Sequence, residues 1–94
     1  MKTRVVHCKK APYDIYIGRP SKWGNIFSSK PSTIAKFRVS SKDEAIDKYE
    51  DWIQTQPELL LDLRELKGKI LGCWCKPGLC HGDVLAHLAD NLSD

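Results

Sequence analysis

The sequence has no uninterrupted apolar run that approaches the roughly 20 residues of a membrane-spanning helix. Its opening residues, MKTRVVHCKK, lack the apolar stretch and the small-residue cleavage site of a secretory signal. Internal repeats, low-complexity tracts and linkers are missing as well. We therefore expect a single domain over residues 1–94 that is cytoplasmic and does not bind membranes.

A strong excess of one charge is also absent. The chain has 15 Lys and Arg against 12 Asp and Glu, a formal net charge of +3. This mild positive bias fits a polyanionic partner or a phosphate-bearing ligand without requiring either. A hydrophobic content of 41% with 29% charged residues is ordinary for a globular protein and excludes wholesale disorder.

The local patterns alternate between strand and helix. They predict strands at 3–8 and 14–18, a third strand or a lead-in to a helix at 34–40, helices at 41–56 and 57–66, a buried strand at 69–75 and a last helix at 80–92. Ser41 with Glu44 is a capping box, and Pro57 suits a first helical turn. The order predicts a small α/β domain whose short mixed sheet, of about three to four strands, is covered by about three helices.

Cysteine is scarce but concentrated. Three of the four cysteines and two of the three histidines lie in ILGCWCKPGLCHGDVLAHL, residues 70–88. Strand alternation places Cys73 and Cys75 on one face and Trp74 on the other. The turn KPGL then leads to Cys80 and His81 at the start of the last helix, where the helix N-terminus favours a thiolate or a bound anion.

Three interpretations of this cluster compete. Cys73, Cys75, Cys80 and His81 are suitable zinc ligands, although the spacing C-x-C-x₄-C-H differs from the usual zinc knuckle. Alternatively, the strand–loop–helix junction is an active or binding site, in which Cys80, His81 and Asp83 perform thiol or proton chemistry. The third interpretation is structural, because cysteine is often buried, and it suits Cys73 best. We favour the second.

A second group of candidate residues lies in YDIYIGRPSKWGNIF. Arg19 offers a planar fork for phosphate, Trp23 a stacking surface, and Asn25 an amide for a ligand or a turn. The alternative is a loop with turn residues and a buried tryptophan anchor. The predicted ligand-binding residues are Gly18, Arg19, Ser21, Trp23, Gly24, Asn25 and Cys75.

Together, YIGRPSKWGN and LGCWCKPGLCHGDVLAHL resemble the bacterial and bacteriophage family called Domain of Unknown Function 4326. The resemblance covers almost the whole chain. The family pattern usually has proline after WGN, where this chain has Ile26. The Cys8 position varies in that pattern, which argues against Cys8 as an obligate ligand. The resemblance implies no activity.

The sequence thus supports two hypotheses of function. The first is an enzyme that binds an anion or nucleotide where the loop 18–25 meets the junction 75–83, and acts on a nucleotide or nucleic-acid component. The second is a non-enzymatic module that binds a host protein or nucleic acid, with or without structural zinc. Zinc is the one cofactor that the residues suggest.

Overall fold

In the central sheet, a strand from the C-terminal part of the chain lies between two strands from the N-terminal part. The computed structural model describes residues 2–28, 37–74, 76, 78 and 80–92. Three parallel strands lie in the order β1-β5-β2, which are Arg4–His7, Ile70–Cys73 and Ile15–Tyr16. Because β5 has a neighbour on both edges, its last three residues are buried, as is typical of an inner parallel strand.

The helices begin where the sequence predicts. They are α1 (Lys42–Ile53), α2 (Pro57–Asp62), which continues as a short 3₁₀ turn (Leu63–Glu65), and α3 (His81–Asp90). The Ser41 hydroxyl accepts the backbone N–H of Glu44 at 3.1 Å, which confirms the predicted cap of α1. The Glu44 carboxylate in turn accepts the N–H of Ser40 at 2.7 Å, one residue earlier than in the usual capping box.

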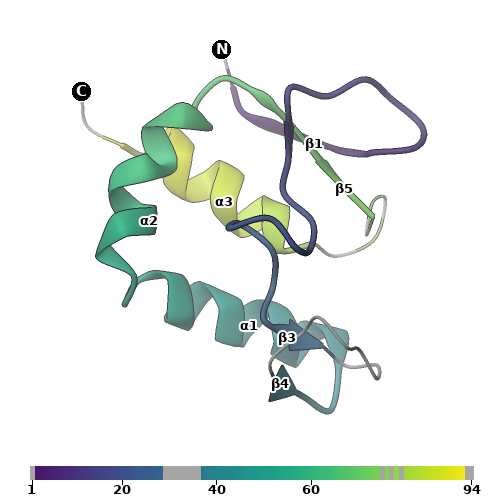
Figure 1. The fold of residues 1–94 in the computed structure, drawn as a ribbon, viewed down its shortest axis with the longest axis vertical. Helices are drawn as coiled ribbons and strands as arrows, with labels where there is room; N and C mark the ends of the chain where they lie inside the picture. The colour runs from purple at the N-terminus through teal and green to yellow at the C-terminus, as the bar shows by residue number, and fades with distance from the viewer. Residues whose placement is uncertain (1, 29–36, 75, 77, 79, 93–94) are drawn as a thin grey trace.

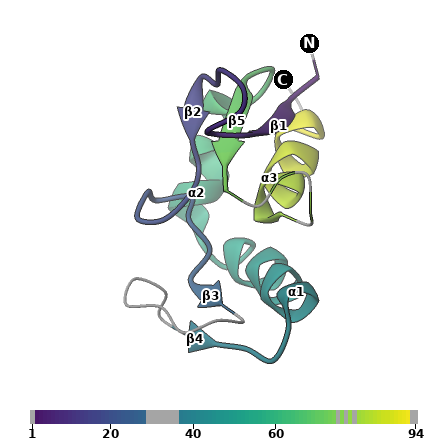
Figure 2. The same ribbon diagram turned by 90° about the vertical axis from the view of Figure 1, so that its right-hand side faces the viewer.

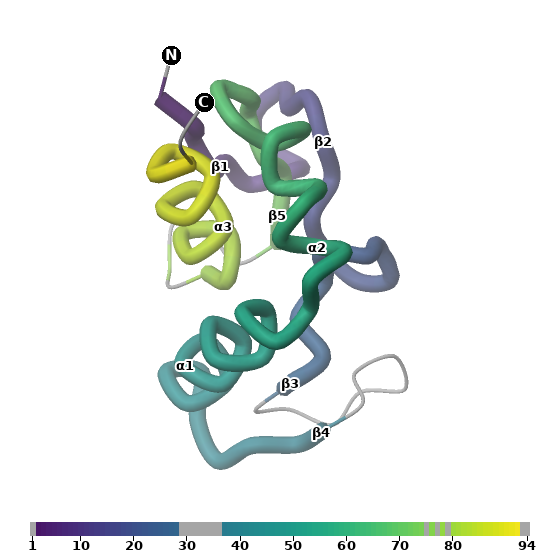
Figure 3. Tube along the Cα trace, turned by 90° about the vertical axis from the view of Figure 1, so that its left-hand side faces the viewer, coloured from purple at the N-terminus to yellow at the C-terminus, as the bar shows by residue number. Residues whose placement is uncertain are grey.

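The elements form two parts of a flat molecule that measures 37 × 32 × 19 Å. In one part, α2 and α3 lie on the same side of the three-stranded sheet (Figures 1 and 3). In the other, α1 packs beside a two-stranded parallel sheet of β3 (Phe27–Ser28) and β4 (Phe37–Arg38). Among the described residues, no helix is both long and apolar enough to cross a membrane.

The core lies where the two parts meet. It combines the inward faces of α1 and α3 and the 3₁₀ turn after α2 with the sheet and the loop before β3. Its members are Ile17, Trp23, Tyr49, Ile53, Leu63, Leu66, Leu71, Cys73, Cys80, Val84, Leu85 and Ala89. In the sequence, Tyr49 and Ile53 recur at helical spacing, as do Val84 and Leu85, which predicts that they face inward. The structure confirms this prediction.

The fold class is α/β, as the element order predicts. The described strand pairs are all parallel, whereas the sequence suggested a mixed sheet. The reason is that β2 does not fold back on β1 as a hairpin, because β5 pairs between them. The two prolines, the glycine and the serines of residues 19–32 predict a long loop, but this segment also contains β3, whose two residues pair with β4.

Candidate functional site

Two segments far apart in the sequence meet at the start of α3. A Cβ atom on Gly82, in the first turn, would lie 2.6 Å from Ile17 Cδ1 and 2.8 Å from Val5 Cγ1. These distances are too short for a real side chain, so glycine lets α3 approach the sheet this closely. His81 Nε2 consequently lies 2.8 Å from the Ile17 carbonyl oxygen. This hydrogen bond fixes α3 to the chain just before Gly18.

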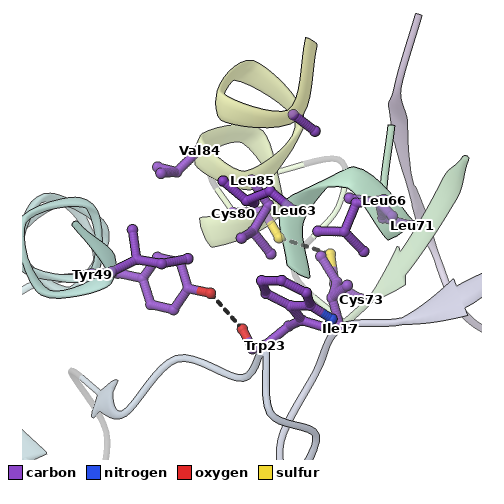
Figure 4. Close-up of a cluster of buried hydrophobic side chains, with 12 residues drawn as sticks. Ile17, Trp23, Tyr49, Leu63, Leu66, Leu71, Cys73, Cys80, Val84 and Leu85 are labelled. Atoms are coloured by element: carbon purple, nitrogen blue, oxygen red, sulfur yellow. Dashed lines mark hydrogen bonds between the residues drawn. The ribbon is translucent and has the colours of Figure 1, made fainter. Parts of the chain in front are cut away.

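Cys80 is the N-cap residue of α3, so it lies at the start of the last helix as predicted. Its Sγ accepts the backbone N–H of Gly82 at 3.3 Å. The Sγ of Cys73, at the end of β5, lies 2.8 Å away (Figure 4). Both side chains are buried, and the separation exceeds the ~2.05 Å of a disulfide bond. Two thiols therefore share one buried contact between β5 and α3.

The ring nitrogens of His81 have different roles. A carbonyl oxygen can only accept, so we assign the proton of the neutral ring to Nε2, which donates to Ile17. Nδ1 is then an acceptor, and it lies 3.8 Å from Cys80 Sγ. Burial lowers the pKa of His81, although the hydrogen bond to Ile17 acts in the opposite direction. The neutral imidazole is thus favoured, with its lone pair towards the thiol.

Tyr49 of α1 closes the site from the other part of the molecule. Its ring meets His81 edge to face, with the centroids 5.0 Å apart, and its hydroxyl donates to the Trp23 carbonyl at 2.7 Å. Burial raises the pKa of Tyr49 far above its ordinary value, so the hydroxyl stays protonated. The helical spacing predicts Tyr49 in the core but does not predict this second role. Its position on the inward face of α1 is the only signal in the sequence.

A charged pair lies next to the two thiols. Lys76 Nζ is 2.7 Å from Asp83 Oδ1 in the first turn of α3. The hydrogen bond to Asp83 raises the pKa of Lys76, and the charges of Cys80 and Cys73 raise it further. Asp83, one of the predicted catalytic residues, thus holds a lysine close to the thiols.

The loop before β3 forms a buried frame for this site. Trp23 is only 2% exposed and lies beside Cys73 (Figure 4). The Asn25 amide donates to the Ala45 carbonyl at 3.1 Å, and its oxygen accepts the N–H of Phe27 at 2.9 Å. The buried anchor, the alternative for this loop, is what the structure shows for Trp23, and Asn25 holds the turn. Neither side chain offers an open surface for stacking.

The turn from Gly18 to Gly24 contains one unusual polar atom. Ser21 N–H donates to the Gly18 carbonyl, and Gly24 N–H to the Ser21 carbonyl, each at 2.9 Å. The Ser21 hydroxyl is buried and has no hydrogen-bond partner among the described residues. Buried hydroxyls usually have one, from protein, water or a ligand. The half-buried Arg19 is close enough for its charge to lower the pKa of His81.

The predicted zinc ligands come together in part. Cys73, Cys80 and His81 are neighbours, whereas Cys75 lies outside the described residues. Within the described ranges, no group of three His, Cys, Asp or Glu side chains could hold a metal ion. The zinc site remains a prediction.

A pocket of about 470 Å³ lies on another side of α3. It is lined by Lys2, Thr3, Val5, Asp83, Ala86, His87, Asp90 and Asn91. His87 is exposed, as expected from its position in the middle of the helix. The thiols and His81 are not among the lining residues, so this pocket adjoins the site described above only through Asp83.

Comparison with known proteins relates the chain to viral sequences. It is 34% identical over 93 residues to the "Uncharacterized 12.4 kDa protein in nrdA-td intergenic region" of Enterobacteria phage T4, covering 95% of this chain and 79% of that protein. It is 36% identical over 88 residues to "Uncharacterized protein R718" of Acanthamoeba polyphaga mimivirus, covering 80% of this chain and 65% of that protein. No solved structure matches it.

The family comparison spans nearly the entire chain. The model of the Domain of unknown function (DUF4326) matches residues 2–91. This range contains both the loop 18–25 and the thiol–histidine junction at the start of α3. The chain therefore belongs to the DUF4326 family.

Proposed function

We propose that the protein is an enzyme that acts on a nucleotide or another nucleic-acid component through Cys80 and His81. The main support is the convergence of three groups at the start of α3: Cys80 Sγ, the acceptor Nδ1 of His81 and the N–H of Gly82. A nucleophile beside a base that a third group orients is the usual arrangement for covalent catalysis. Here the Ile17 carbonyl orients the base.

In the proposed reaction, Cys80 is the nucleophile and His81 is the base. His81 Nδ1 takes the proton of the Cys80 thiol, and burial keeps the imidazole neutral before this step. The Gly82 N–H, the helix dipole and the nearby Lys76 ammonium stabilise the thiolate. The thiolate then attacks an electrophilic carbon of the substrate and forms a carbon–sulfur bond. The leaving group departs with the electron pair of its own bond and takes the proton from His81.

The ligand class follows from the groups around the thiol. Lys76 lies close enough to Cys80, and Arg19 to His81, for their positive charges to act on these groups. The buried Ser21 hydroxyl offers a donor and an acceptor. Cations and a hydroxyl group, together with the N-terminus of a helix, are suited to a phosphate group. We therefore expect a phosphate-bearing small molecule as the substrate.

Alkylation by iodoacetamide over a pH series tests the nucleophile. We expect one thiol to ionise below the ordinary value of about 8.5, and peptide mapping to identify it as Cys80. The variant Cys80→Ser should lose this fast phase. The variant Cys8→Ser, which removes a half-buried thiol outside the site, should keep it. A nucleoside monophosphate should slow the fast phase in the wild-type protein and do so less in Arg19→Gln.

Two results would contradict the proposal, in whole or in part. If every cysteine reacts only after unfolding, Cys80 is not an activated nucleophile. If Cys80 reacts fast but no nucleoside monophosphate protects it, the nucleotide part of the proposal is wrong and the thiol chemistry stands.

A binding module with structural zinc is the second candidate, and the contact between the buried sulfurs of Cys73 and Cys80 favours it. Cys75 and His81 would complete the ligand set. The metal content of protein purified without a metal-binding tag tests this function. About one zinc per chain, lost with stability on chelation, is the expected result for such a module. The variant Cys73→Ser should then bind less zinc, and metal-free folded protein would rule the module out.

A further inference from the structure

The three-stranded sheet has a second face, opposite to α2 and α3. Figure 2 views the described chain from this side, which the segment between β1 and β2 crosses. Val5 of β1 points to α3, because its Cγ atoms lie next to Gly82. Alternation along the strand then directs Arg4 and Val6 to the opposite side, together with Gly72, the partner of Val6 in β5. We call this side the open face.

Tyr13 lies flat on the open face. A Cβ atom on Gly72 would lie 2.5, 2.7 and 2.9 Å from Cγ, Cδ1 and Cδ2 of Tyr13. These similar distances show that one face of the ring covers the glycine. The side chain is still 42% exposed, so the other ring face is directed to solvent. Because Gly72 has no side chain, the ring of Tyr13 packs directly on the strand, and its other face forms a flat aromatic surface.

Trp74 is held beside Tyr13 by its neighbours. Its Nε1–H donates to the Tyr16 hydroxyl at 2.8 Å, and the ring of Tyr16 lies 6.3 Å from that of Tyr13. His7 meets the Trp74 ring edge to face, with a centroid distance of 5.6 Å. Trp74 is nevertheless 55% exposed. A large apolar ring that is both exposed and held in place is more typical of a binding surface than of a core.

Positive charge lies next to Trp74. Lys9 Nζ lies over the Trp74 ring, 5.5 Å from its centroid. Residues 1–13 contain four Lys or Arg and no Asp or Glu. Asp14 is the first acidic residue of the chain, and its carboxylate accepts the N–H of Ile70 at 2.8 Å. The first part of the chain therefore carries cations to the edge of the aromatic surface.

We propose that the open face binds single-stranded nucleic acid. Bases stack on Tyr13 and Trp74, and the basic side chains of Arg4, Lys9 and Lys10 contact the phosphates. Aromatic platforms bordered by positive charge bind single strands, because every base has a flat face and every nucleotide a negative phosphate. Base pairs in a duplex are already stacked on each other, so a duplex gains less from these rings.

This proposal is independent of the enzymatic one. Strand alternation places the Cys73 side chain in the core and leaves Trp74 exposed, so the thiol site and the open face lie on opposite sides of β5. The charge complementarity also favours a polyanion over a second copy of the chain, whose own open face would bring the same positive charge against it.

Fluorescence anisotropy of labelled 12-mers of dT and rU, with a 12-base-pair DNA duplex for comparison, tests the proposal. The single strands should bind more tightly than the duplex. Tyr13→Ala and Trp74→Ala should each weaken binding by roughly 5- to 150-fold. Phe37→Ala is the matched control, because this aromatic residue is 54% exposed but lies on β4.

The charge contribution is measured in the same assay. Lys9→Gln should reduce the slope of log affinity against log salt by about 0.7, the value for one phosphate contact on a single strand. Lys42→Gln, on the exposed start of α1, should leave the slope unchanged. Cys80→Ser should bind the oligonucleotides as the wild-type protein does, so a failure of the thiol chemistry is distinguishable from a failure here.

Three outcomes would overturn the proposal. The first is no binding at protein concentrations up to about 100 µM, the weak end of ordinary non-specific binding. The second is binding that all aromatic variants retain, which would show simple charge attraction. The third is self-association that Trp74→Ala removes without any oligonucleotide binding, which would make the open face a contact between copies of the chain.

Discussion

His81 connects three parts of the molecule through one ring. Nε2 donates to the Ile17 carbonyl, Nδ1 faces Cys80, and the ring meets that of Tyr49 edge to face. Each contact constrains the ring, and the surrounding burial disfavours its charged form. The residue is therefore both a positioned base and a pH-sensitive element of the fold.

The lowered pKa of His81 predicts a loss of stability in mild acid. Below about pH 6.5 the unfolded chain takes up a proton that the folded protein resists, so the free energy of unfolding falls as the pH falls. This single group can contribute up to about 1.4 kcal/mol per pH unit between its folded and unfolded pKa. Urea unfolding from pH 7.5 to pH 5 measures the slope.

His81→Gln removes the titration while its amide can still donate to the Ile17 carbonyl, so this variant should show a shallower slope below pH 6.5. His87→Gln is the control, because His87 is exposed on the same helix. An equal slope in the wild-type protein and His81→Gln would show that protonation of His81 does not oppose folding.

The two tryptophans near the site show how far single residues can be predicted. Alternation along the strand correctly directs Trp74 away from Cys73, since one is 55% exposed and the other fully buried. Trp23 lies in a loop without any period, so its composition allowed a ligand contact and a core anchor equally. Tertiary packing decided between them, because Tyr49 and Cys73 enclose Trp23 from elements distant in sequence.

At the scale of elements, helices were predicted better than strands. Helix α1 follows from its own residues, because Ser41 caps it and its apolar positions recur at helical spacing. Strands β3 and β4 have two residues each and pair across a segment outside the described residues. A pattern this short carries no periodicity, so the pairing could not be read from the sequence.

The sequence predicts where α3 begins, but it does not predict what the first turn of α3 packs against. The sequence places Cys80 at the beginning of the last helix, where a thiol accepts a backbone N–H. It does not reveal that Gly82 lets Ile17 reach the helix, because the two residues come from distant segments. The sequence therefore does not predict the hydrogen bond between His81 and the Ile17 carbonyl.

At the scale of the whole molecule, β5 separates two chemical environments. Its core side carries Cys73 towards the thiol–histidine site, and its other side carries Gly72 under Tyr13. Because the strand is buried between β1 and β2, each side has a rigid support. One strand thus provides the base for both proposed sites.

The chain's two ends are joined by one buried threonine. The Thr3 hydroxyl donates to Asp90 at 2.6 Å and accepts the N–H of Gly68 at 2.9 Å. Asp90 also accepts the backbone N–H of Thr3 at 3.1 Å. These hydrogen bonds lower the pKa of Asp90. They link the start of β1, the end of α3 and the turn before β5 in a single node.

This node predicts that Thr3→Val destabilises the protein although the two side chains have nearly the same shape. The change removes the hydroxyl and leaves the Gly68 N–H without its partner, at a cost of about 1–3 kcal/mol in the free energy of unfolding. Urea unfolding at pH 7 measures the loss. Thr55→Val is the matched control, because its hydroxyl donates to the Trp52 carbonyl on the exposed surface, and it should cost about 0.5 kcal/mol or less. An equal loss of unfolding free energy in the two variants would contradict this prediction. The buried hydrogen bonds of Thr3 would then contribute no more to stability than the exposed one of Thr55.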